Sequence, residues 1–148
     1  MLEEAYRVSA IALATIALRS SNVLIADKAT GVLLDIFKTN QAMQSDYLNS
    51  ILADLLCYMA MESIHQHIRE NAKKSLMDKF ADFLATKRNK AAAIALANIV
   101  LLTEDKSLRE EILAFLTEKI GASEIGLSGQ SLESLRHIVM YKPELLSL

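Results

Sequence analysis

Glu62 and His65 form an E-x-x-H pair, the spacing with which helices of carboxylate-bridged di-iron bundles hold their metal. Residues three apart lie on one side of a helix, so the two side chains could share an ion. A complete site also needs a second such pair, and the sequence has none. His67 lies two residues from His65 and points to a different side. Metal binding through Glu62 and His65 is therefore a second alternative, and solvated surface histidines are the ordinary interpretation.

Two other patterns lack a required part. Cys57 would need a neighbouring base to act as a nucleophile, and its neighbours Leu56 and Tyr58 are not activating, so we expect a buried, small hydrophobic residue. The segment 121–128, GASEIGLS, has the glycine spacing of a phosphate-binding loop, but Leu127 stands at the position of the required lysine. We therefore expect neither enzymatic activity nor a cofactor.

Basic residues are concentrated in the middle of the chain. Residues 69–90 carry seven Lys or Arg against three acidic residues, whereas the whole chain has a net charge of −2. At about 100° per residue these side chains fan around a helix and do not line one face, as in an ordinary solvated helix. A nucleic-acid-associated subunit that uses this segment is the first alternative function. The candidate contacts to an anionic partner are Arg69, Lys73, Lys74, Lys79, Lys87, Arg88 and Lys90.

Composition places the chain in a reducing compartment. A single cysteine allows no internal disulfide, which fits the cytoplasm. Glu3 and Glu4 occupy the region where a secretory signal would be basic, and the apolar run 8–18 is too short for a membrane span of roughly 20 residues. The apolar fraction of 52% exceeds the usual range of about 45–50%, which suggests that some apolar surface covers a partner.

Helical patterns account for most of the chain. Proline occurs once, and Gly31 is the only glycine before residue 121. Gly31 within a helix predicts a close helix crossing. The sequence therefore predicts a single all-α domain over residues 1–148, a bundle of about six or seven helices. The predicted helices lie at about 2–19, 22–38, 45–69, 75–88, 90–102, 108–120 and 131–141.

The segment AIALATIAL at 10–18 recurs as AIALANIVL at 93–101, with seven of nine positions identical at an offset of 83 residues. Neither copy has a wide polar face, so we expect both helices to be buried on every side. Weaker matches continue, so that residues 5–58 echo residues 88–142. The chain would then have two similar three-helix halves, and chance similarity among Ala, Ile and Leu is the alternative.

Residues 55–61, LLCYMAM, are seven apolar residues in succession, so every side of this helix must be covered by the core or by another chain. Together with the apolar excess, this segment gives the leading hypothesis. We expect a non-enzymatic helical interaction protein, a small subunit or adaptor whose apolar helix faces contact a protein partner or a second copy. The candidate partner contacts are Leu55, Leu56, Tyr58, Met59 and Met61.

Overall fold

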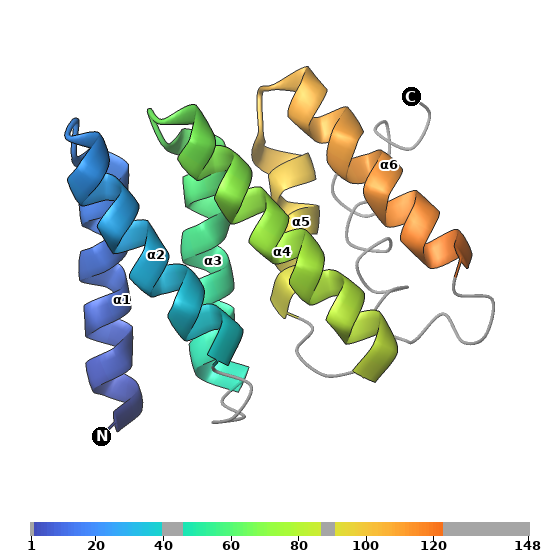
Figure 1. Cartoon of the computed structure of the whole chain (residues 1–148). Helices are drawn as coiled ribbons and strands as arrows, with labels where there is room; N and C mark the ends of the chain where they lie inside the picture. The colour runs from blue at the N-terminus through green and yellow to red at the C-terminus, as the bar shows by residue number, and fades with distance from the viewer. Residues whose placement is uncertain (1, 40–45, 87–90, 123–148) are drawn as a thin grey trace. The chain divides into compact units, whose positions relative to one another are not determined.

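The computed structural model describes residues 2–39, 46–86 and 91–122 together with the short turns among them (Figure 1). These residues contain six helices and no strand, which confirms the all-α prediction. None of the described helices is long and apolar enough to cross a membrane. The helix predicted at 131–141 lies outside the described residues. The helices are α1 (Leu2–Arg19), α2 (Val23–Thr39), α3 (Asp46–Glu62), α4 (Gln66–Thr86), α5 (Ala91–Leu102) and α6 (Lys106–Ala122).

The chain divides into two compact units, Met1–Leu76 and Met77–Leu148, with the boundary inside α4. In the first unit α1 packs against both α2 and α3, and α2 also contacts α3. In the second unit α5 packs against α6. A chain of helical repeats can form compact units without being two domains, so the single-domain organisation stays a prediction.

Three of the helix pairs, α1–α2, α3–α4 and α5–α6, are each joined by a three-residue turn of one design. The turns lie at 20–22, 63–65 and 103–105. In each turn the first residue has a hydroxyl whose oxygen accepts the backbone N–H of the third residue, at 3.1, 3.2 and 3.1 Å. We refer to α1–α2 as hairpin 1, α3–α4 as hairpin 2 and α5–α6 as hairpin 3. The hydroxyl residues are Ser20, Ser63 and Thr103.

The three hairpins share one register. Each position of hairpin 1 is followed by its equivalent 43 residues later in hairpin 2 and 40 residues after that in hairpin 3. The offset of 83 found in the sequence is therefore two steps of a shorter repeat, and a period of 40–43 residues is typical of stacked helix pairs. Buried residues recur in this register at Ala10, Ala53 and Ala93, at Ala17, Ala60 and Val100, and at Leu33, Leu76 and Leu116.

Two of the three helix matches in the predicted duplication fall on described residues. The sequence matched the first predicted helix with the fifth and the second with the sixth, and these pairs are α1 with α5 and α2 with α6. The third match, to residues 131–142, lies outside the described residues. The smallest recurring unit in the described part of the chain is a two-helix hairpin.

The two Ala-rich helices differ in burial. In α5 most side chains are buried, with Ile94 a partly exposed exception, as the sequence predicted. In α1 only the stripe Ala10, Ala14 and Ala17 is buried. The prediction that α1 is buried on every side is therefore wrong. Its alanines allow a close approach to neighbouring helices on one side, while the opposite side has no neighbour among the described residues of the first unit (Figure 1).

The predicted helix over 45–69 is also wrong, because α3 ends at Glu62 and α4 begins at Gln66. The turn between them is held by the Ser63 hydroxyl and by Arg69, whose guanidinium donates to the Ser63 carbonyl oxygen at 2.5 Å. In hairpin 3 the equivalent residue, Arg109, donates to the carbonyl oxygens of Thr103 and Val100. α4 then continues without a break through the point near Ser75 where a new helix was predicted.

Gly31 lies on the exposed side of α2 and not at the predicted close crossing, because a Cβ placed there meets no atom within 4 Å. We expect Gly31→Ala to raise the free energy of unfolding by about 0.5–1 kcal/mol, since alanine removes backbone freedom from the unfolded chain. Urea unfolding measures this change in the free energy of unfolding, and the m-value should stay the same. Ala114→Gly, at an exposed position of α6, is the matched control and should lose a similar amount. A loss of stability in Gly31→Ala would contradict the finding that there is open space for a Cβ at this position.

Candidate interaction site

The exposed side of α1 carries three large apolar side chains, Val8, Ile11 and Ile16. Figure 1 shows α3 to one side of α1 and no other helix of the first unit on the opposite side. We call this exposed side the outer face of α1. It is apolar or small along its length, with one charged residue at each end, Glu4 and Arg19. Its other members are Ala5, Val8, Ser9, Ile11, Ala12, Thr15 and Ile16.

The repeat register shows that part of this face belongs to a core pattern. Ile16 is 42% exposed, whereas its equivalents Met59 and Ile99 are both 0% exposed. In α2 of the same hairpin, Ile25 is 50% exposed and its equivalent Ile68 is 0% exposed. Hairpin 1 thus exposes large apolar side chains at positions that hairpin 2 buries.

Two polar side chains of the outer face, Thr15 and Glu4, have partners within α1. The Thr15 hydroxyl donates to the Ile11 carbonyl oxygen at 2.8 Å, so the methyl group of Thr15 remains for packing. Glu4 forms an ion pair with Arg7. The hydrogen bond from Arg7 lowers the pKa of the Glu4 carboxyl, which is therefore ionised at neutral pH. The face consequently offers an apolar strip whose only charges lie at its ends.

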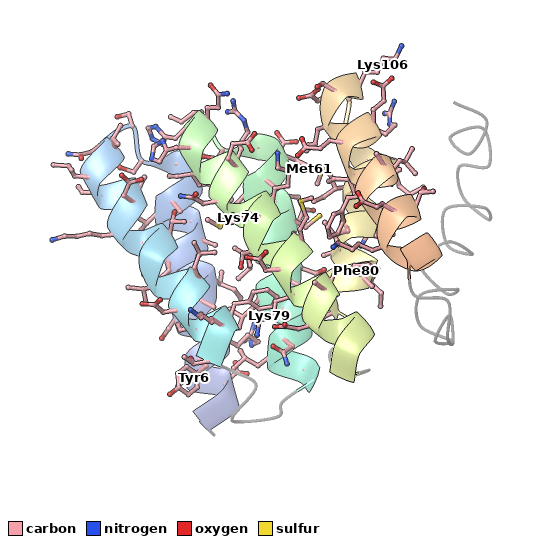
Figure 2. The ribbon with its side chains drawn as sticks, turned by 45° about the vertical axis from the view of Figure 1, so that its right-hand side comes forward. Tyr6, Met61, Lys74, Lys79, Phe80 and Lys106 are labelled. Carbon is pink, nitrogen blue, oxygen red and sulfur yellow. The ribbon has the colours of Figure 1, made fainter. Side chains whose placement is uncertain are left out.

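The partner interface predicted on α3 is largely part of the core. Leu56 and Met59 are fully buried, Leu55 and Met61 are half-buried, and Tyr58 is 56% exposed. Including Leu56 and Met59 among accessible contacts was wrong, because the helical period turns both residues inward. Figure 2 shows Met61 near the carboxyl end of α3. The accessible remainder of the predicted interface is Tyr58 with parts of Leu55 and Met61.

The described basic residues of 69–90 do not form one cationic surface. Arg69 is half-buried and holds the turn at Ser63. Lys73 is buried, with its amino group 2.6 Å from a Glu70 carboxylate oxygen, and Lys79 is also buried. Only Lys74 is exposed among these four (Figure 2). The structure therefore gives the nucleic-acid alternative no support in the described residues, and the remaining candidates, Lys87, Arg88 and Lys90, lie outside them.

The helix break separates the predicted metal ligands. Glu62 ends α3 and His65 lies in the following turn, so the two residues do not share a helix face as predicted. The His65 ring Nε2 lies 2.9 Å from the Ser20 carbonyl oxygen, and the His67 ring is hydrogen-bonded to the Asp27 carboxylate. Both histidines thus link hairpin 2 to hairpin 1. The described residues contain no group of three or more His, Cys, Asp or Glu side chains that could hold a metal.

Cys57 is buried, as the sequence predicted. Burial raises the pKa of its thiol to about 12, and the negative charge of Asp54 adds to the effect. The nucleophilic form of cysteine is the thiolate, so at neutral pH this side chain is an inert part of the core. The hypothesis of a cysteine nucleophile therefore has no physical support at this position.

A shallow groove lies beside the turn at 63–65. Its residues come from α2, from the turn and from the first two turns of α4. The histidines that line it are engaged with Ser20 and Asp27, as described above, so the groove is bordered by groups that stabilise the packing of the hairpins. It is lined by Val23, Ile64, His65, Gln66, His67, Glu70 and Asn71.

Comparisons with known proteins found no matching protein-family model, curated protein or solved structure. Sequence reasoning missed the outer face of α1, although the register contains a signal for it. Where hairpin 2 has the buried leucines Leu48 and Leu52, hairpin 1 has the small residues Ala5 and Ser9.

Proposed function

We propose that the protein is a non-enzymatic interaction protein that binds a protein partner through the outer face of α1. The exposure of Ile16, at a position that hairpins 2 and 3 bury completely, is the observation that carries this proposal. Fully burying a Val or Ile side chain contributes about 1.5–3 kcal/mol, so covering the half-exposed Val8, Ile11 and Ile16 would give a substantial part of that for each residue.

The partner that fits this surface is a protein with an apolar helical face. The outer face is long, narrow and nearly free of charge, which suits a helix that packs along it more than a nucleic acid or a small anion. The single, buried Cys57 is consistent with action in a reducing compartment such as the cytoplasm. The local bond of Thr15 removes the main desolvation cost at the centre of the face.

The test is capture from native lysate by the purified chain and two variants. Ile16→Glu places a charge on the outer face, and we expect it to reduce capture at least about tenfold, because an unpaired carboxylate would be buried in the contact. Leu24→Glu is the matched control, since Leu24 is exposed on α2 outside the outer face of α1. Circular dichroism checks that both variants fold. Equal capture by the wild type and Ile16→Glu would contradict the proposal.

A further inference from the structure

We propose that the occupant of the outer face of α1 is a second copy of this chain, with the two α1 helices antiparallel across a two-fold axis. The inference rests on the proposed function, because it requires that this face is an interface. It names the partner and fixes the direction of the contact. Isologous contacts of this kind close at two copies and are the commonest form of self-association.

Charge complementarity sets the direction. Glu4 lies at the amino end of the face, where it forms an ion pair with the partly buried Arg7 of its own helix, and Arg19 lies at the carboxyl end. In an antiparallel pair each Arg19 lies opposite Glu4 of the other copy, so no two like charges of the face meet. A parallel pair would place Arg19 against Arg19, which is repulsive.

The register that matches the charges also matches the sizes of the side chains. With Glu4 opposite Arg19, the two-fold axis passes between Ile11 and Ala12. Ile11 of one copy then lies opposite Ala12 of the other, and each of these contacts joins a large side chain to a small one. Ridges that meet small residues let two helices approach closely. At the centre of the face the large Ile11 of each copy therefore meets the small Ala12 of the other.

Sedimentation velocity on the full chain, over about a hundredfold range of concentration, tests the association. We expect a reversible dimer for the wild type and for the control Leu24→Glu. Ala12→Glu places two carboxylates beside the axis and should give a monomer with unchanged helical circular dichroism. Arg19→Glu should raise the dissociation constant about tenfold, and adding Glu4→Arg in the same chain should restore it, because the ends are then matched again with reversed sign.

Introduced cysteines test the antiparallel direction. Cys57 is buried and its pKa is raised, so an added cysteine is the reactive one among the described residues. Ala12→Cys lies next to the two-fold axis and should form a disulfide between copies on mild oxidation. Val8→Cys should not, because Val8 of one copy lies opposite Thr15 of the other, too far from its own equivalent to bridge. Cross-linking by both variants would indicate a parallel contact and overturn the direction.

The outcomes separate this inference from the proposed function. A wild-type chain that stays monomeric at every concentration overturns the second copy as the partner. If that monomer still captures a different protein in a manner that depends on Ile16, the proposed function stands. A folded Ala12→Glu dimer would show that association uses another surface, which overturns the inference, and the lysate result for Ile16→Glu then decides the proposed function by itself.

Discussion

Met59→Ala should lower the free energy of unfolding by about 2–5 kcal/mol, whereas Ile16→Ala, at the equivalent position of hairpin 1, should cost less than about 1 kcal/mol. Met59 is fully buried, so its truncation removes packed methylene groups and leaves a cavity. Ile16 has solvent on one side, and little packing is lost when it is shortened. Because Ile16 and Met59 occupy equivalent positions of two hairpins, the difference between the two variants reports mainly the difference in burial.

Chemical denaturation of both variants and the wild type measures the difference. The denaturation should be measured at a protein concentration where the chain is monomeric, since self-association would add to the apparent stability of the wild type. Ile99→Ala provides a third equivalent position, and it should behave like Met59→Ala because Ile99 is also fully buried. A cost at Ile16 as large as that at Met59 would mean that the outer face of α1 is covered within the monomer.

Phe80→Ala should be the most damaging single truncation among the described residues of the second unit, at about 3–5 kcal/mol. The Phe80 ring is fully buried and meets Phe115 edge to face, with ring centroids 5.8 Å apart. Both the buried area and the ring contact are lost on truncation. Phe37 occupies the equivalent position in hairpin 1 and is also buried, so Phe37→Ala should have a comparable effect.

Thermal or urea unfolding of Phe80→Ala, with Tyr58→Ala as the control, tests this prediction. Tyr58 is an exposed aromatic residue on α3, and its truncation should change the free energy of unfolding by less than about 1 kcal/mol. The prediction fails if truncating Phe80 and truncating Tyr58 lower the free energy of unfolding by the same amount. It also fails if Phe80→Ala is tolerated while Phe37→Ala is not, because the hairpins would then not share one packing scheme.

The sequence predicted the boundaries of those helices that begin with an ordinary N-cap residue. α1 ends before Ser20, and α2 begins after Asn22, whose side-chain oxygen accepts the backbone N–H groups of Leu24 and Ile25. α5 and α6 are separated by the same kind of turn, in which the Asp105 carboxylate accepts the N–H of Leu108. Asn and Asp are strong N-cap residues, so these boundaries were predictable to within a few residues.

The break between α3 and α4 was missed because its signals are weak locally. The turn at 63–65 contains neither Gly nor Pro and has His65 where the other two turns have Asn22 and Asp105. The turn is held by Arg69, which lies six residues from Ser63 and donates to its carbonyl oxygen, a contact that composition does not reveal. An offset of 43 residues would have aligned Ser63 with Ser20, so the shorter repeat was the usable signal.

The candidate sites were less predictable than the helices, because a run of apolar or basic residues does not show which of them face inward. Leu56, Met59, Lys73 and Lys79 are buried although their neighbours Tyr58 and Lys74 are exposed. In the same way the segments 10–18 and 93–101 have nearly the same sequence but differ in burial, because the burial of a helix depends on the helices packed against it.

A helix with an uncovered side opens more easily than one that is packed on several sides. Local opening of a folded chain is expected to begin where few apolar contacts hold an element. The backbone amides of α1 should therefore exchange with solvent faster than those of α3, which buries more of its side chains. A partner that covers the outer face would slow exchange first in α1, so binding would be read out as a change in the dynamics of this helix.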